Sequence, residues 1–212
     1  MSTLIRYFVS FLFVLPAIIL HEISHGYVAY LLGDPTAKSR GRLSLNPIRH
    51  IDPFGTLLLP AILLILSNGT AAFGYAKPVP INPRYFKNYR MGMFLTGIAG
   101  PSTNIALAVI SGVAVRFMDP NATITSIIYT FAYINLVLVF FNLIPIPPLD
   151  GSRVLPLFLS DSAMHTYMQV ERYGFGILMV LLWGVPMVLR VDPIGWYLNN
   201  TVEPLLRVIV GG

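Results

Sequence analysis

The chain has 212 residues, of which 55% are hydrophobic and 11% charged, and its mean hydropathy is +0.71. Soluble domains carry about 25% charged residues, so this composition excludes a soluble globular domain, a disordered chain, a coiled coil and a nucleic-acid-binding domain. The formal net charge is +5, and eight of the fourteen Lys and Arg residues fall between positions 38 and 90. There is no cysteine. Any metal must therefore be held by His, Asp or Glu.

Apolar segments predict a multipass α-helical membrane protein. A helix needs about 20 apolar residues to cross about 30 Å of hydrocarbon. Four segments meet or approach this length: Leu4–Leu32, Met91–Met118, Ile124–Ile146 and Tyr173–Leu189. A further apolar segment, Gly55–Leu66, holds only 12 residues, too few to cross at about 1.5 Å per residue. We expect this segment to be re-entrant or interfacial.

The basic residues predict the orientation. Positively charged loops stay in the cytoplasm, and basic residues lie on both sides of Gly55–Leu66: Lys38, Arg40, Arg42 and Arg49 before it, Lys77, Arg84, Lys87 and Arg90 after it. Both flanks are then expected to be cytoplasmic and the N-terminus outside. We expect the protein to lie in the plasma (inner) membrane, with the active site near the cytoplasmic side. The tail Asp192–Val210, with its aromatic residues, is expected along the outer interface.

Two loop stretches look extended. Lys38–Asn46 alternates partly between apolar and polar residues, and Phe73–Ile81 combines aromatic residues, Val and two prolines. Prolines confine a strand to the edge of a sheet. We therefore expect a small β element at the cytoplasmic membrane surface, with Phe73–Ile81 as an edge to which an extended substrate adds.

The first predicted span carries an HExxH pattern, His21-Glu22-Ile23-Ser24-His25. Residues four apart share one face of a helix, so both imidazoles can bind one Zn²⁺. Glu22 can reach a water on that metal and act as general base. Because an ionisable group at the bilayer centre costs about 2.5–3.5 kcal/mol, we favour a zinc site over a chance occurrence of the pattern.

Two histidines leave such a site incomplete, because catalytic zinc usually has three protein ligands and one open position. Asp150 is the candidate third ligand, since it follows Pro145, Pro147 and Pro148, which end the third span. Unpaired backbone at membrane depth survives only inside protein or beside water, which predicts a wet cavity near Asp150. The alternative stays open that Asp150 caps the helix that begins at Ser152.

Together these motifs resemble the site-2 proteases, the family of intramembrane zinc metalloproteases, in its compact prokaryotic type without PDZ or CBS domains. The matching pieces are HEISH at 21–25, GRLSLNPIRHIDPFGTLLLP at 41–60, GYAKPVPINPR at 74–84, GIAGPSTN at 97–104 and NLIPIPPLDGSR at 142–153. The resemblance implies that His21, His25 and Asp150 bind one zinc ion per chain and that Glu22 is catalytic. It also implies a three-helix core and membrane-anchored protein substrates.

Three other polar residues are candidates for a role in or near the site. Asn142 stands where the family has an asparagine near the active site, and it either donates to the developing oxyanion or makes a buried interhelical hydrogen bond. Asn104 follows a glycine-rich helix start and is interpreted as structural. His50 is either an accessory ligand or, as we favour, a loop-organising residue.

The sequence thus predicts one intramembrane metalloprotease domain over residues 1–212, with a catalytic core at about 4–153 and a C-terminal helix and interfacial tail at 173–210. Two rival functions remain, a metal transporter and an inactive substrate-binding relative. A transporter is expected to show ionisable ligands in several spans and internal repeats, and neither is visible. An inactive relative is expected to have lost the base or a ligand, yet all four groups are present. The partners predicted are membrane-anchored substrates and the lipid bilayer, with no nucleic acid.

Overall fold

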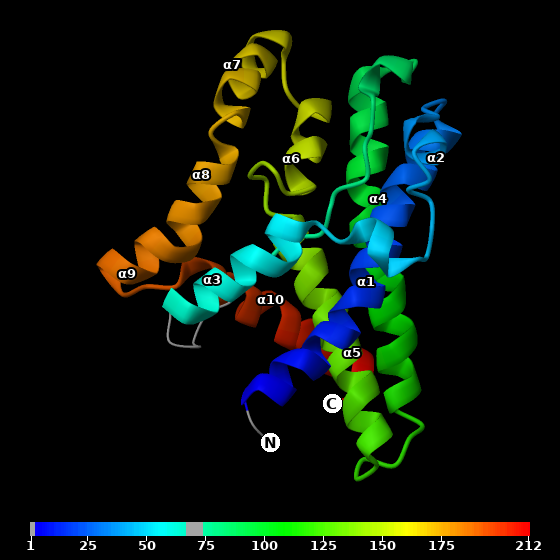
Figure 1. Cartoon of the computed structure of the whole chain (residues 1–212), viewed down its shortest axis with the longest axis vertical. Helices are drawn as coiled ribbons and strands as arrows, with labels where there is room; N and C mark the ends of the chain where they lie inside the picture. The colour runs from blue at the N-terminus through cyan, green and yellow to red at the C-terminus, as the bar shows by residue number, and fades with distance from the viewer. Residues whose placement is uncertain (1–2, 67–73) are drawn as a thin grey trace.

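Three long helices form the centre of the molecule (Figure 1). The computed structural model describes residues 3–66 and 74–212. The central helices are α1 (Thr3–Leu31), α4 (Tyr89–Val115) and α5 (Thr123–Asn142). α4 packs against both α1 and α5 and runs antiparallel to each. All three contain apolar stretches of 18 residues or more that are long enough to cross a membrane.

A bent pair of segments supplies a fourth candidate span. α7 (Asp161–Glu171) is followed, at an angle of 66°, by the helical stretch 174–189. That stretch consists of α8 (Gly174–Met179), a π-helical turn η5 (Val180–Gly184) and α9 (Val185–Leu189). The prediction of a multipass helical membrane protein is therefore confirmed, and the described residues offer three candidate spans, or four with the bent pair, against the four expected.

Several helices are capped at their N-termini by a side-chain oxygen of Asn, Ser or Asp, which accepts a backbone N–H of the first turn. Asn88 accepts the Met91 N–H at the start of α4 at 3.1 Å, and Ser160 does the same for α7. These bonds satisfy backbone donors that have no partner inside a helix, and they fix where α4 and α7 begin.

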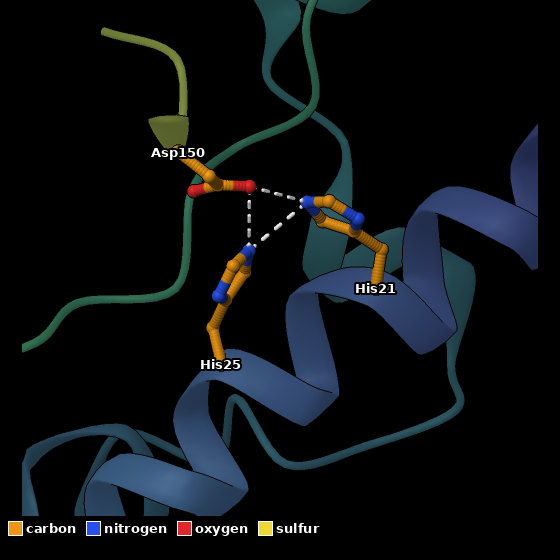
Figure 2. Close-up of side chains that lie close together, drawn as sticks. All are labelled: His21, His25 and Asp150. Atoms are coloured by element: carbon orange, nitrogen blue, oxygen red, sulfur yellow. Dashed lines mark hydrogen bonds and ion pairs between the residues drawn. The ribbon is translucent and has the colours of Figure 1, made fainter. Parts of the chain in front are cut away.

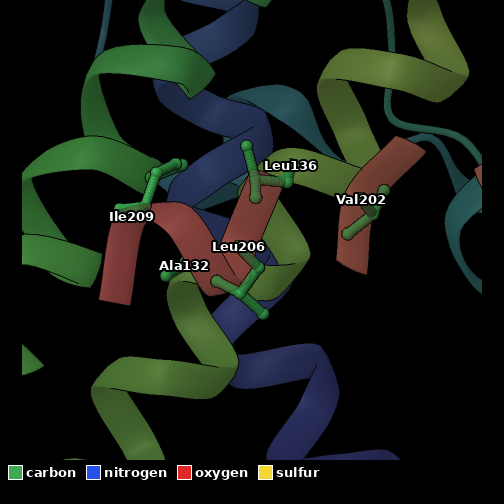
Figure 3. Packing of buried hydrophobic residues seen from close by; sticks show 6 residues of the cluster. Ala132, Leu136, Val202, Leu206 and Ile209 are labelled. Carbon is green, nitrogen blue, oxygen red and sulfur yellow. The ribbon is translucent and has the colours of Figure 1, made fainter. Parts of the chain in front are cut away.

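The C-terminal helix α10 (Pro193–Val210) packs across α4 and α5. One face buries Val202, Leu206 and Ile209 against Ala132 and Leu136 of α5 (Figure 3), while Trp196 on the other face is exposed. At its end, the Arg116 guanidinium donates to the carbonyls of Val208 and Ile209. α10 therefore braces the central helices, and one of its faces stays available to its surroundings.

The predicted β element is wrong, because residues 3–66 and 74–212 contain no strand. Lys38–Asn46 begins inside a single helical turn, α2 (Thr36–Ser39), and continues irregularly to the 3-10 turn η1 (Pro47–His50). The segment Gly74–Asn82, which we call the strap, is extended but unpaired, and Phe73 lies outside the described residues. Pro78 and Pro80 lack donors, and the amides of Tyr75, Lys77 and Val79 bind three separate acceptors rather than one partner strand.

Residues at the two ends of the short apolar segment lie close together, Gly55 at its start and Tyr75 beyond its end. A π-helical turn η2 (Pro53–Leu58) leads into α3 (Leu59–Leu66), which lies across the central helices rather than along them (Figure 1). The two ends of this excursion are joined where the Tyr75 N–H donates to the Gly55 carbonyl at 3.0 Å and Thr56 Oγ1 donates to the Tyr75 carbonyl. A 3-10 turn, η3 (Pro83–Tyr85), then leads towards α4.

Candidate metal centre

The two histidines of HExxH meet Asp150 in a buried group of three (Figure 2). Nε2 of His21 lies 2.9 Å from Nε2 of His25, and Oδ2 of Asp150 lies 2.9 and 3.0 Å from the two nitrogens. Each residue is at most 6% exposed. The i, i+4 spacing on α1 thus places both rings as predicted, with an edge-to-face angle of 82°.

The outer nitrogen of each imidazole is held by α4. Nδ1 of His25 lies 2.5 Å from the Thr96 carbonyl, which can only accept, so this nitrogen donates. Nδ1 of His21 lies 2.5 Å from Oδ1 of Asn104. The amide of Asn104 is oriented by its own donation to Oδ1 of Asn135 at 2.7 Å and to the Ala17 carbonyl. His21 therefore donates as well, and both tautomers are fixed.

These tautomers show that the group suits a cation. With both Nδ1–H groups committed outward, two imidazole lone pairs and one carboxylate oxygen face one another at 2.9–3.0 Å. Such acceptors repel one another unless a cation or a proton lies among them. Two nitrogens and one oxygen also match the three protein ligands of a catalytic zinc site with its fourth position open.

A glycine lets α4 pass close to the two histidines. α4 passes the two imidazoles at Gly100, where a Cβ atom would overlap both rings. Asp150 stands at the start of the short helix α6 (Gly151–Val154) but makes no side-chain capping bond there. Its second oxygen, Oδ1, instead lies 3.3 Å from Nη1 of Arg153. The alternative interpretation, in which the Asp150 side chain caps the following helix, is therefore wrong.

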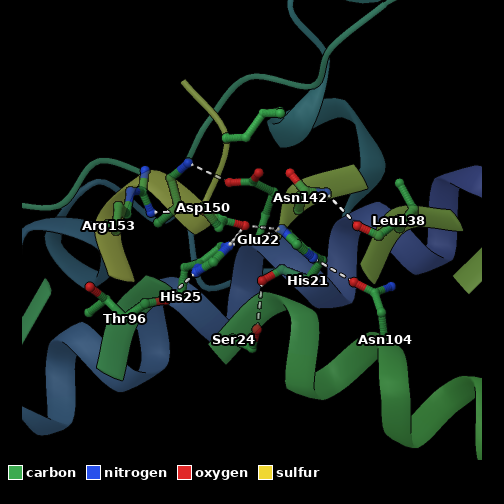
Figure 4. A network of polar contacts seen from close by, with 12 residues as sticks. His21, Glu22, Ser24, His25, Thr96, Asn104, Leu138, Asn142, Asp150 and Arg153 are labelled. Carbon is green, nitrogen blue, oxygen red and sulfur yellow. Dashed lines mark hydrogen bonds and ion pairs between the residues drawn. The ribbon is translucent and has the colours of Figure 1, made fainter. Parts of the chain in front are cut away.

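An open cavity of about 480 Å³ adjoins the three residues. Glu22 lines it, half-buried, close to His21, His25 and Asp150 (Figure 4). It accepts the Val79 N–H of the strap on Oε2 at 2.8 Å. Apolar residues from α5, α8 and the strap form most of the remaining wall, among them Leu138, Phe175 and Pro78. A carboxylate thus lies in an open cavity beside His21, His25 and Asp150, which we call the ligand group, where it could act on a water at the open position of a bound metal.

Comparisons with known proteins agree with this geometry. Peptidase family M50 matches residues 118–185. "Putative zinc metalloprotease YwhC" of Bacillus subtilis is 38% identical over 187 residues, which are 84% of this chain and 78% of the relative. The chain belongs to peptidase family M50. It is thus a zinc metalloprotease of the site-2 protease type, as its motifs suggested.

More distant members of family M50 are longer. "Putative zinc metalloprotease Rip2" of Mycolicibacterium smegmatis is 30% identical over 79% of this chain and 64% of its own. "Zinc metalloprotease MJ0392" of Methanocaldococcus jannaschii is 27% identical over 87% of this chain but only 45% of its own. No solved structure matches the chain. Membership of a protease family argues against the transporter interpretation.

The remaining polar candidates of this M50 protein lie as follows. Asn142 is half-buried, lines the cavity and donates one amide hydrogen to the Leu138 carbonyl of its own helix at 2.9 Å. This bond is not the interhelical one considered from the sequence. His50 is buried and pairs Nε2 with the Ser44 carbonyl at 2.7 Å, away from the ligand group. It organises its loop, as favoured.

Sequence reasoning missed two residues that hold this site. Asn135 orients Asn104 and is fully buried in the apolar helix α5, so an amide inside a predicted span was the available signal. Arg42 is 7% exposed and donates from Nη2 to the Lys77 carbonyl of the strap at 2.5 Å. Desolvation lowers the pKa of Arg42 from its ordinary value, and the nearby charge of Glu22 opposes that shift. Nothing in the basic run distinguished Arg42 from its neighbours.

Proposed function

We propose that this zinc metalloprotease is an intramembrane endopeptidase that cleaves transmembrane segments of membrane-anchored proteins. The observation that carries the proposal is the position of the ligand group. His21 and His25 are buried on a helix apolar enough to span a membrane, and the cavity beside them is mostly apolar in its wall. A substrate reaching these residues must be compatible with the same surroundings.

In this proposal His21, His25 and Asp150 hold the zinc ion. When bound, zinc supplies Lewis-acid polarisation of the scissile carbonyl and lowers the pKa of a water. Glu22 takes the proton of the attacking water and delivers it to the leaving amine. Asn142 has a second amide hydrogen besides the one given to Leu138, and it donates this hydrogen to the carbonyl oxygen as negative charge develops there.

The test compares wild type with Glu22→Gln, reconstituted in lipid with a synthetic transmembrane peptide. The amide cannot accept the proton of the water, so we expect turnover to fall by about 10²–10⁴-fold while zinc content by elemental analysis stays unchanged. Comparison of membrane-peptide products in cells with either form would identify native substrates. Turnover of the variant close to wild type would remove Glu22 as the base.

We further propose that the whole chain forms one protease domain in the plasma membrane, with the N-terminus outside and the active site near the cytoplasmic side. The basic flanks of the short apolar segment support this orientation. Because the chain has no cysteine, single introduced cysteines test it. An impermeant thiol reagent added outside should label a cysteine at Thr123 and spare one at Asn88. Asn88 immediately precedes α4, and Thr123 follows the loop after α4. The reverse pattern would invert the proposed orientation.

A further inference from the structure

The strap is fixed on one side by a regular alternation of backbone bonds. Tyr75 donates its N–H to the Gly55 carbonyl at 3.0 Å, Lys77 to the His50 carbonyl at 2.9 Å, and Val79 to the carboxylate of Glu22 at 2.8 Å. Alternate residues of an extended chain point their amides to the same side. The strap therefore turns this side to the protein, and its last such amide reaches the proposed general base.

The contact between Val79 and Glu22 tolerates little displacement. The Val79 side chain is 4% exposed and lies against α1 at Gly26, where a Cβ atom would come within 2.7 Å of Val79 Cγ1. Its N–H lies 2.8 Å from Oε2, and hydrogen bonds weaken steeply as distance and angle depart from their optimum. A shift of the strap would therefore change the orientation of the Glu22 carboxylate.

Arg42 is the charged side chain that holds the strap next to this contact. Its Nη2 donates to the Lys77 carbonyl at 2.5 Å, two residues from Val79. The residue is 7% exposed, and within residues 3–66 and 74–212 its buried Nε finds no hydrogen-bond acceptor. A guanidinium is costly to bury. Its burial also distinguishes Arg42 from exposed basic residues such as Arg40, which are available to bind anionic lipid.

We propose that Arg42 is a positioning residue of the protease: by holding the Lys77 carbonyl it keeps the Val79 N–H on Glu22, so that the carboxylate is aimed at the attacking water. This inference rests on the proposed function, in which Glu22 is the base. Arg42 touches neither the ligand group nor the wall of the cavity. Its loss should therefore leave zinc in place and reduce the rate of the chemical step.

The experiment uses the full chain with two substitutions at Arg42. Arg42→Met keeps much of the side-chain volume but removes the charge and the hydrogen-bond donors, whereas Arg42→Lys keeps the positive charge and a donor on a shorter side chain. Arg40→Met is the matched control for loss of one basic charge. For Arg42→Met we expect kcat to fall by roughly tenfold or more, with KM and zinc content near wild type. Peptides covering residues 75–82 should exchange their amide hydrogens faster. Arg42→Lys should restore part of kcat, and Arg40→Met should match wild type.

Three results would overturn the proposal: unchanged kcat in Arg42→Met, a fall in kcat that follows loss of zinc, or an equal fall in Arg40→Met. If Arg42→Met cannot be recovered folded, Arg42→Gln is read by the same measurements. Failure of the proposed function is recognised separately, because wild type and Glu22→Gln would then cleave the peptide equally. Faster exchange at the strap with an unchanged kcat would show that Arg42 anchors the strap without positioning Glu22, and would also refute the inference.

Discussion

The two sides of the cavity are held in different ways. On the helical side, His21 and His25 stand on α1, and their outer nitrogens bind Thr96 and Asn104 of α4. Regular helices fix these backbones by their own hydrogen bonds. The strap on the other side has no regular structure. Single bonds to separate groups, such as the one from Val79 to Glu22, hold it in place.

This difference suggests a division of labour between metal binding and turnover. Ligands for zinc must be placed accurately before the metal binds, and the rigid helical side provides this. The strap contacts Glu22, the proposed general base, rather than one of the proposed zinc ligands. Variants that remove a proposed zinc ligand, or a side chain that holds one, should therefore lose zinc, whereas variants of the strap should keep zinc and turn over more slowly.

Asp150→Ala should have the largest effect, with loss of both zinc and activity. The variant removes the one oxygen ligand of the group and leaves two buried imidazoles facing each other. Zinc content of the purified protein, measured beside Glu22→Gln, separates the two roles, since only Asp150→Ala should lose the metal. Wild-type zinc affinity in Asp150→Ala would show that the third ligand lies elsewhere.

Asn142→Ala should have the second largest effect. It is an exception to the division between the two sides, because it should slow turnover without loss of zinc. Asn142 belongs to α5 on the helical side, yet it lines the cavity without touching a ligand. Its bond to Leu138 fixes the amide, so the second hydrogen is preoriented as an oxyanion donor must be. We expect kcat to fall by about 100-fold with zinc retained. A change below threefold in steady-state kinetics would leave Asn142 a structural residue.

The helical side was largely predictable because its signals are local. The i, i+4 spacing of His21 and His25 acts within one helix, and the length of an apolar run decides whether it can span a membrane. Asp150 was reached through the prolines that end the preceding helix. Its exact partners, by contrast, depend on how α1, α4 and α5 pack, and no spacing in the sequence encodes that.

The strap was mispredicted because its pattern has two solutions. Alternation in Lys38–Asn46 and the extended residues around Pro78 fit a sheet edge, but a ladder needs a partner strand at the correct distance. In the structure the amide of Val79 finds a carboxylate, and that of Lys77 finds a lone carbonyl. Such contacts join residues far apart in the chain, so they follow from the tertiary fold and not from the local pattern.

Asn104→Ala should have an intermediate effect and sharpen the comparison. Losing a hydrogen-bond partner of a metal-binding histidine lowers metal affinity by about 10–100-fold, and the His21 ring would also lose its fixed tautomer. Activity should therefore fall at limiting zinc and recover when zinc is added. Zinc titration followed by activity measures this. A loss of activity that excess zinc cannot restore would place Asn104 in the chemical step instead.

Val79→Pro should have the smallest effect of the four, and it tests the strap directly. Val79 stands between Pro78 and Pro80, so its backbone is already restricted to the extended region, which includes the polyproline II conformation that proline adopts. The substitution removes the N–H that binds Glu22. A hydrogen bond to a charged group is worth about 1.5 kcal/mol or more, which corresponds to a loss in kcat of roughly tenfold.

Val79→Ala is the matched control, because it keeps the N–H and removes most of the side chain buried beside Gly26. If the backbone bond matters most, the proline variant should be slower than the alanine variant while both hold zinc as wild type does. Equal rates in the two variants would assign the effect to packing. Loss of zinc in Val79→Pro alone would contradict the division of labour, because the strap would then support the metal ligands as well as the base.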